Sequence, residues 1–109
     1  PANRPPPHNP LVRDLEKGSG PAAQVGDELK AYYAGAVYKT GKVKYYGWPP
    51  SPPMSFELGS GTIPKLWELG FEGLRAGGVR EVVAPSRFFA GTGAIDYVMV
   101  LVSVNPAER

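Results

Sequence analysis

The sequence predicts an α+β fold in which five or six antiparallel strands wrap around one short helix. Three observations support this prediction. Segments with strand-like alternation make up most of the chain, 14 glycines and 13 prolines separate them, and a single segment begins with helix signals. A chain of 109 residues with 42% hydrophobic residues is long enough for one core, so we expect one domain.

The first half of the chain contains three predicted strands. Residues 11–16 form the first, and a turn at 18–21 closes it. Residues 28–37 alternate between apolar and polar positions, which predicts a half-buried strand. A hairpin turn at Thr40-Gly41 then leads into a strand at 43–46.

The second half contains the helix and the remaining strands. Residues 48–53 are predicted to be a loop outside the sheet, because proline cannot donate a hydrogen bond to a sheet ladder. The loop leads to a strand at 54–58. The helix begins after Gly61 with Thr62 as N-cap and Pro64 in its first turn, and it ends near Gly70. Its predicted apolar face is Ile63, Leu66, Trp67 and Phe71. Strands follow at 79–84 and 96–104, and the last is apolar on both faces, as in a central strand.

Proline is concentrated at the start of the chain. Residues 1–10 include five prolines and few groups that could pack, which predicts an extended or disordered lead. The folded domain is therefore expected to span residues 11–109.

Composition excludes several classes of function. Twelve Lys and Arg nearly balance ten Asp and Glu, without a basic run, so we expect no nucleic-acid partner. Cysteine is absent and His8 is the one histidine, so neither a catalytic triad nor a Cys- or His-rich metal site is expected, and no cofactor is expected. No stretch approaches the roughly 20 apolar residues that a membrane-spanning helix needs.

The order of short motifs resembles the FKBP family of peptidyl-prolyl isomerases. The motifs run from residues 11–20 through Val25-Gly26-Asp27, Tyr33-x-Gly35, Gly41-Lys42, Phe56-x-Leu58-Gly59-x-Gly61, Trp67-Glu68-x-Gly70 and Gly77-Gly78-x-Arg80 to the last strand. Together they cover about residues 11–104. The proline-rich lead resembles secreted bacterial members, and the chain begins at Pro1, so we expect an exported or cell-envelope protein with its leader removed.

The resemblance implies an FKBP-like roll and a site for proline-containing peptides. It implies that the protein is a monomer that assists protein folding by turning X-Pro bonds in an apolar pocket. Trp67 is the implied floor of this pocket. The implied catalytic positions are Trp67, Tyr33, Ile63 and Met99, and the implied substrate-binding positions are Met54, Phe56, Tyr45, Tyr46, Trp48, Pro64 and Ala90.

Several of these positions depart from the family pattern. The hairpin that usually reads Phe-Asp-Ser-Ser is Lys44-Tyr45-Tyr46-Gly47, and Ala90 replaces a tyrosine. Pro64 stands where a backbone N–H usually faces the ligand, although a shift of one residue would give that role to Ile63. We therefore expect low activity and weak macrolide binding.

Two functions remain open at this stage. The first is a prolyl isomerase. The alternative is a catalytically weak module that holds proline-containing peptides against Tyr45, Tyr46, Trp48 and Trp67, or a small ligand in the same cleft. Trp67 and Tyr33 are also compatible with ordinary core packing, and the aromatic segment 45–48 with a simple cover over the sheet.

Overall fold

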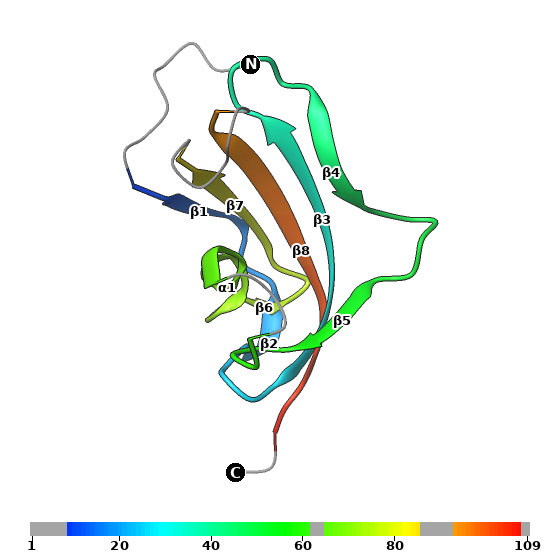
Figure 1. Ribbon diagram of the computed structural model, residues 1–109. Coiled ribbons are helices and arrows are strands. Elements are labelled where there is room, and N and C mark those ends of the chain that lie inside the picture. The colour runs from blue at the N-terminus through cyan, green and yellow to red at the C-terminus, as the bar shows by residue number, and fades with distance from the viewer. Residues whose placement is uncertain (1–8, 62–64, 86–92, 108–109) are drawn as a thin grey trace.

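The computed structural model describes residues 9–61, 65–85 and 93–107, which form a curved antiparallel sheet with one helix on its concave side (Figure 1). The main sheet has six strands in the order β1-β7-β8-β3-β4, and β5 also pairs with β3. The strands are β1 (Leu11–Glu16), β3 (Glu28–Val37), β4 (Val43–Gly47), β5 (Met54–Glu57), β7 (Val79–Ala84) and β8 (Ile95–Asn105). The predicted sheet and its central last strand are confirmed.

The pairing of β3 with β8 fixes the two faces of the sheet. Tyr33 lies opposite Met99 and Gly35 opposite Tyr97, and these positions face the helix. Side chains alternate along a strand, so Tyr32 and its partner Val100 face the convex side. We call the helix side the inner face and the convex side the outer face.

The edge of β3 is shared by two strands. β4 pairs with the second half of β3, and β5 pairs with the first half. The proline-rich loop between them leaves the sheet after Gly47 and returns at Met54, as Figure 1 shows for the segment that joins β4 and β5. This loop follows the prediction, because its prolines lack the N–H that a strand ladder needs.

A second small sheet was not expected. Residues 18–21 were predicted as a turn, but β2 (Ser19–Ala22) pairs with β6 (Arg75–Ala76). Gly18 and Gly20 have φ of +73° and +88°, values that glycine adopts readily and that are common in turns, which is why these residues resembled a turn in the sequence. The partner strand lies 55 residues further on, and local sequence could not reveal it.

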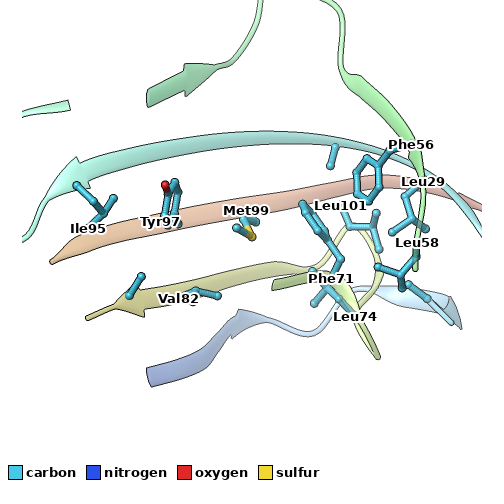
Figure 2. Packing of buried hydrophobic residues seen from close by; sticks show 13 residues of the cluster. Leu29, Phe56, Leu58, Phe71, Leu74, Val82, Ile95, Tyr97, Met99 and Leu101 are labelled. Carbon is cyan, nitrogen blue, oxygen red and sulfur yellow. The ribbon is translucent and has the colours of Figure 1, made fainter. Parts of the chain in front are cut away.

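The helix α1 (Lys65–Phe71) packs its apolar side onto the inner face. Phe71 is fully buried against Phe56, at 5.1 Å between ring centroids, and Leu66 and Trp67 pack against the same core. Figure 2 shows Phe71 and Leu74 beside the inward side chains of β8. The helix ends close to the predicted residue, whereas Thr62, Ile63 and Pro64 lie outside the described residues.

The last strand corrects one expectation. β8 is central, yet only one of its faces is fully buried: Ile95, Tyr97, Met99 and Leu101 are at most 3% exposed, while Val102 on the other face is 43% exposed. Strands buried on both faces occur where helices cover both sides of a sheet. Here the described helix covers one side only.

One buried cation ties the helix to the sheet. Arg80 on β7 donates through Nη1 to the carbonyls of Leu69 (3.1 Å) and Glu72 (2.8 Å), at the end of α1. Its Nε donates to Asp14 on β1 at 2.5 Å. The last turn of α1 has no basic residue of its own, so Arg80 supplies the positive charge that a helix C-terminus favours.

Candidate functional site

Trp67 is the centre of an aromatic group on the inner face. Its ring centroid lies 4.6 Å from that of Tyr33 on β3, with the planes tilted by 57°. Tyr97 on β8 is 5.5 Å away in an edge-on arrangement at 64°. Tyr45 on β4 stacks on Tyr97 at 5.8 Å and 28°. These four residues, Tyr33, Tyr45, Trp67 and Tyr97, are called the aromatic cluster below.

The members of the aromatic cluster differ in exposure. Tyr97 is 3% exposed and belongs to the core, whereas Trp67, Tyr33 and Tyr45 are each partly buried and partly exposed. Aromatic pairs favour offset or edge-on geometries of this kind, with centroids 4.5–7 Å apart. The cluster therefore has a rigid, buried base and three ring surfaces that a ligand could contact.

Two glycines make room for these rings. A Cβ at Gly35 would lie 2.7 Å from Cε1 of Tyr97, and a Cβ at Gly47 would collide with the Tyr33 ring. Gly35 is in β3 and Gly47 ends β4, so each faces a cluster ring across a strand pair. Any larger residue at either position would displace a ring from its place beside Trp67.

The cluster is built from uncharged side chains. Burial raises the pKa of the Tyr97 hydroxyl above its usual value, and a hydrogen bond from the Trp67 indole opposes this increase. Lys44 places a cation over a cluster ring, with its Nζ 5.9 Å from the Tyr45 centroid. No group of three or more acidic, His or Cys side chains suited to a metal occurs in the described residues.

The predicted site residues on the inner face fall into two groups. Trp67, Tyr33 and Tyr45 come together, and Met54 on β5 is half-buried against the same core. Met99 is fully buried and Phe56 is 7% exposed, and both belong to the core. Met99 presents no surface to a bound peptide and Phe56 presents little, so both form the core behind the cluster, and their assignment to the site stays a prediction.

Two other predicted residues lie on the opposite face of the sheet. Tyr46 pairs with Ala34, which faces outward. The ring centroid of Trp48 lies 6.1 Å from that of Tyr32, which also faces outward. The predicted grouping of Tyr45, Tyr46, Trp48 and Trp67 around one ligand is therefore wrong. Successive strand residues point to opposite faces, so the adjacent tyrosines 45 and 46 are separated by the thickness of the sheet. Ile63, Pro64 and Ala90 are outside the described residues.

Tyr97 is the cluster residue that the sequence prediction missed. The site residue expected on the last strand was Met99, two residues further on. Both residues face inward, so alternation could not separate them. Only the register distinguishes them, because Tyr97 lies opposite Gly35 and Met99 opposite Tyr33.

Comparison with known proteins identifies the family. A family model described as FKBP-type peptidyl-prolyl cis-trans isomerase matches residues 20–92, which include β3, β4, α1 and three members of the aromatic cluster. An FK506-binding protein of Streptomyces anulatus is 33% identical over 86 residues, which are 79% of this chain and 69% of that protein. The chain belongs to the FKBP-type peptidyl-prolyl cis-trans isomerase family. The predicted FKBP resemblance is thereby confirmed.

Other relatives are much longer than this chain. A protein of Saccharomyces cerevisiae named peptidyl-prolyl cis-trans isomerase is 32% identical over 85 residues, but the chain spans only 20% of its length. A 46 kDa FK506-binding nuclear protein of Spodoptera frugiperda is 34% identical over 74 residues, and the chain spans 18% of it.

Solved structures agree with this FKBP assignment. A protein of Mycobacterium tuberculosis named FKBP12 matches with a TM-score of 0.71 and 28% identity, covering 93% of this chain and 88% of that one. FkpA of Escherichia coli matches with the same TM-score at 25% identity, covering 91% of this chain and 49% of that one. The predicted FKBP-like roll is therefore the observed fold.

Proposed function

We propose that this chain is a peptidyl-prolyl cis-trans isomerase that acts on X-Pro bonds at the aromatic cluster. The observation that carries the proposal is the uncharged, partly exposed indole of Trp67, held between Tyr33 and Tyr97 in a chain of the FKBP family. The proposal keeps the activity and the family that the sequence predicted.

The reaction explains why such a site needs no titratable group. Rotation about a peptide bond faces a barrier of about 18–20 kcal/mol because resonance holds the amide planar. The twisted amide has lost this resonance and its charge separation, so surroundings poor in water favour it over the planar form. Aromatic walls that exclude water therefore lower the barrier without any proton transfer.

Each partly exposed side chain of the site has a role in this proposal. The proline ring lies on the indole of Trp67, and Tyr33 and Tyr45 flank it from β3 and β4. Met54 adds an apolar wall from β5. Tyr97 lies behind them and fixes the ring positions. The assignments of Ile63, Pro64 and Ala90 stay predictions from the family resemblance.

The substituted hairpin still supplies an aromatic ring. Tyr45, in the segment that departs from the usual Phe-Asp-Ser-Ser, faces the cluster and stacks on Tyr97. This supports retained catalysis, whereas the missing carboxylate supports the expectation that macrolides bind weakly. The purely binding module is less favoured, because the four aromatic residues assigned to it divide between two faces of the sheet.

Export and a monomeric state stay predictions. The relatives include bacterial proteins and a nuclear protein, so family membership fits more than one location. Among the described residues, no helix has the length and apolar character to cross a membrane.

The two tryptophans provide a matched test of the site. We expect wild-type protein to accelerate isomerisation of a four-residue X-Pro peptide, measured by exchange NMR. Replacing Trp67 with Ala should lower kcat/KM at least about tenfold, because the flat apolar surface under the proline is lost. Trp48→Ala, on the opposite face, should stay within about twofold of wild type.

A folding defect must be separated from loss of the site. Trp67→Leu retains an apolar side chain against the core and serves as the second variant, with far-UV circular dichroism as the check on folding. It should also lose activity. Equal activity of the Trp67 variants and wild type, with folding intact, would overturn the proposal.

A further inference from the structure

The outer face of the sheet carries a second group of aromatic side chains. The Tyr32 and Trp48 ring centroids are 6.1 Å apart, with planes tilted by 49°. Tyr46 lies nearby on β4, opposite Ala34, and is 61% exposed. Tyr32 and Trp48 are themselves partly exposed. We call Tyr32, Tyr46 and Trp48 the outer aromatic surface.

This surface continues onto half-exposed aliphatic residues. Val98 and Val100 of β8 also face outward, and they pair with Ala34 and Tyr32 of β3. The side chains of Ala34, Val98 and Val100 are short, so the large rings of the outer aromatic surface project beyond them at the β4 edge. Contiguous exposed apolar groups of this kind commonly mark interaction sites.

Lysines predominate in the strands at the β4 edge of the outer aromatic surface. Residues 29–56, which include most of β3, all of β4 and most of β5, contain four lysines and no Asp or Glu, and Glu28 and Glu57 flank this range. The outward-facing acidic residues Asp96 and Glu81 lie further from β4, on β8 and β7. The lysines, all exposed, are Lys30, Lys39, Lys42 and Lys44. The ion pairs of the described residues, Arg13 with Glu81 and Arg80 with Asp14, lie on β1 and β7 at the other side of the sheet.

We propose that the outer aromatic surface and its lysines bind an acidic, extended segment of the client protein whose X-Pro bond occupies the aromatic cluster. Apolar and proline side chains of that segment would lie on the rings, and its carboxylates would pair with the lysines. The choice of the client as occupant rests on the proposed isomerase function. The acidic character of the segment rests on the charge of residues 29–56 alone.

The short strand β4 joins the two sites. Tyr45 faces the aromatic cluster and the next residue, Tyr46, faces the outer surface, while Lys44 lies beside the Tyr45 ring. β4 is the last strand of the sheet order, so a chain can pass around its edge. An extended chain advances at most about 3.6 Å per residue, so about five residues reach roughly 18 Å from one face around this edge to the other. The acidic residues are therefore expected about five residues from the client proline.

The probes for this proposal are two twelve-residue peptides that differ only in charge. Each contains one proline, followed after about five residues by three Glu in one peptide and three Gln in the other. We expect the Glu peptide to bind about tenfold tighter in calorimetry, with NMR shifts at Tyr32, Tyr46 and Trp48. Trp48→Ala and Tyr46→Ala should each weaken the binding of both peptides by about three- to tenfold, because both peptides contact the rings. The double variant Lys30→Ala/Lys42→Ala should instead reduce the difference between the two peptides by about three- to tenfold.

Matched controls come from the opposite edge of the sheet. Leu15→Ala removes a side chain that is 44% exposed on β1, and Lys17→Ala removes an exposed lysine outside the surface. Both should bind the Glu peptide as wild type does. Trp48→Ala should isomerise the four-residue peptide normally while binding both twelve-residue peptides more weakly than wild type.

These measurements separate this inference from the proposed function. If wild type binds the Glu peptide preferentially but isomerises no substrate, the outer surface stands and the isomerase function fails. Equal affinity of wild type for the two peptides, or wild-type affinity of Trp48→Ala and Tyr46→Ala for both of them, would overturn the surface proposal. A single-stranded oligonucleotide that displaces the Glu peptide and binds more tightly would overturn it in favour of nucleic acid.

Discussion

Asp96 shows how the surroundings of a residue in the sheet change its pKa. It faces outward on β8, its Oδ1 is buried without a hydrogen-bond partner, and Glu81 on β7 lies close to it. Burial, together with the hydrogen bond and the charge of Glu81, raises the pKa of Asp96 from 3.8 to about 7, although the charge of Arg13 opposes the shift. The folded protein therefore favours the protonated carboxyl.

This shift gives stability a definite dependence on pH. Between about pH 4 and pH 7 the folded state holds a proton that the unfolded chain releases, so stability should fall as pH rises through this range. The Asp96→Asn variant should lose that dependence and be more stable than wild type at pH 8. We expect a gain on the order of 1 kcal/mol, since solvent screens a half-exposed group. Urea unfolding at pH 5 and pH 8 measures it.

The control for this prediction is another carboxyl. Glu57 is exposed on β5, and Glu57→Gln should keep the wild-type decrease between pH 5 and pH 8. An unchanged pH dependence in Asp96→Asn would show that another group is responsible.

At the scale of elements, the short helix depends on a residue from the sheet. α1 has seven residues, which is too short to be stable alone, and its last turn lacks a basic side chain. Arg80 of β7 fills this gap through Leu69 and Glu72, with Asp14 of β1 as its counterion. The position of Trp67, in the same helix, therefore depends on three elements that are distant in sequence.

Replacing this guanidinium should destabilise the helix and the site together. Arg80→Met retains much of the side-chain volume but leaves two carbonyls and a carboxylate without their donor, and we expect a loss of about 2–4 kcal/mol. Denaturant unfolding gives the stability, and near-UV circular dichroism reports the environment of Trp67.

Arg13→Met is the matched control, because its ion pair with Glu81 involves a side chain that is 66% exposed. It should lose less than about 1 kcal/mol. Similar losses in the two variants would mean that the contribution of Arg80 to the free energy of unfolding does not depend on its burial.

At the scale of the whole molecule, one hydrophobic core joins the helix to every long strand of the sheet except the exposed β1. Leu101 of β8 is fully buried in that core, and its neighbour Val102 faces the outer side with 43% exposure. Both are aliphatic residues of the same central strand, and they differ strongly in burial. They therefore separate core packing from strand propensity.

Removing the core side chain should weaken all elements at once. Leu101→Ala should lower the free energy of unfolding by about 2–5 kcal/mol, a large part of a typical total, whereas Val102→Ala should change it by less than about 1 kcal/mol. Far-UV circular dichroism and tryptophan fluorescence should give coincident transitions in both variants. Separate transitions would show that the helix and sheet do not share one core.

Much of the fold was predictable from the sequence because it depends on local patterns. Alternation over residues 28–37 predicted a strand with the observed bounds, the strand at 79–84 was also predicted with its observed bounds, and the proline-rich loop was correctly left out of the sheet. Local signals could not show that Ser19–Ala22 pairs with Arg75–Ala76, since two-residue pairing across 55 positions leaves no periodic pattern.

The candidate site was predictable only in part. Trp67 and Tyr33 were identified by the family motifs, and the structure brings their rings to 4.6 Å. Tyr97 was missed and Met99 was chosen instead, because inward alternation is common to both. Tyr45 and Tyr46 were assigned to one site, although neighbouring strand residues face opposite sides.

The sequence alone determined the order of the longer elements, the bounds of β3 and β7, and the resemblance to the FKBP family. Each of these is recorded in local periodicity, turn residues and motif order. Only the tertiary structure decided which aromatic residues meet at Trp67 and which stand on the outer face, and it alone placed Arg80 at the end of α1. The reason is physical: which strands pair, and in which register, is set by packing over the whole chain, and a shift of one residue exchanges the two faces.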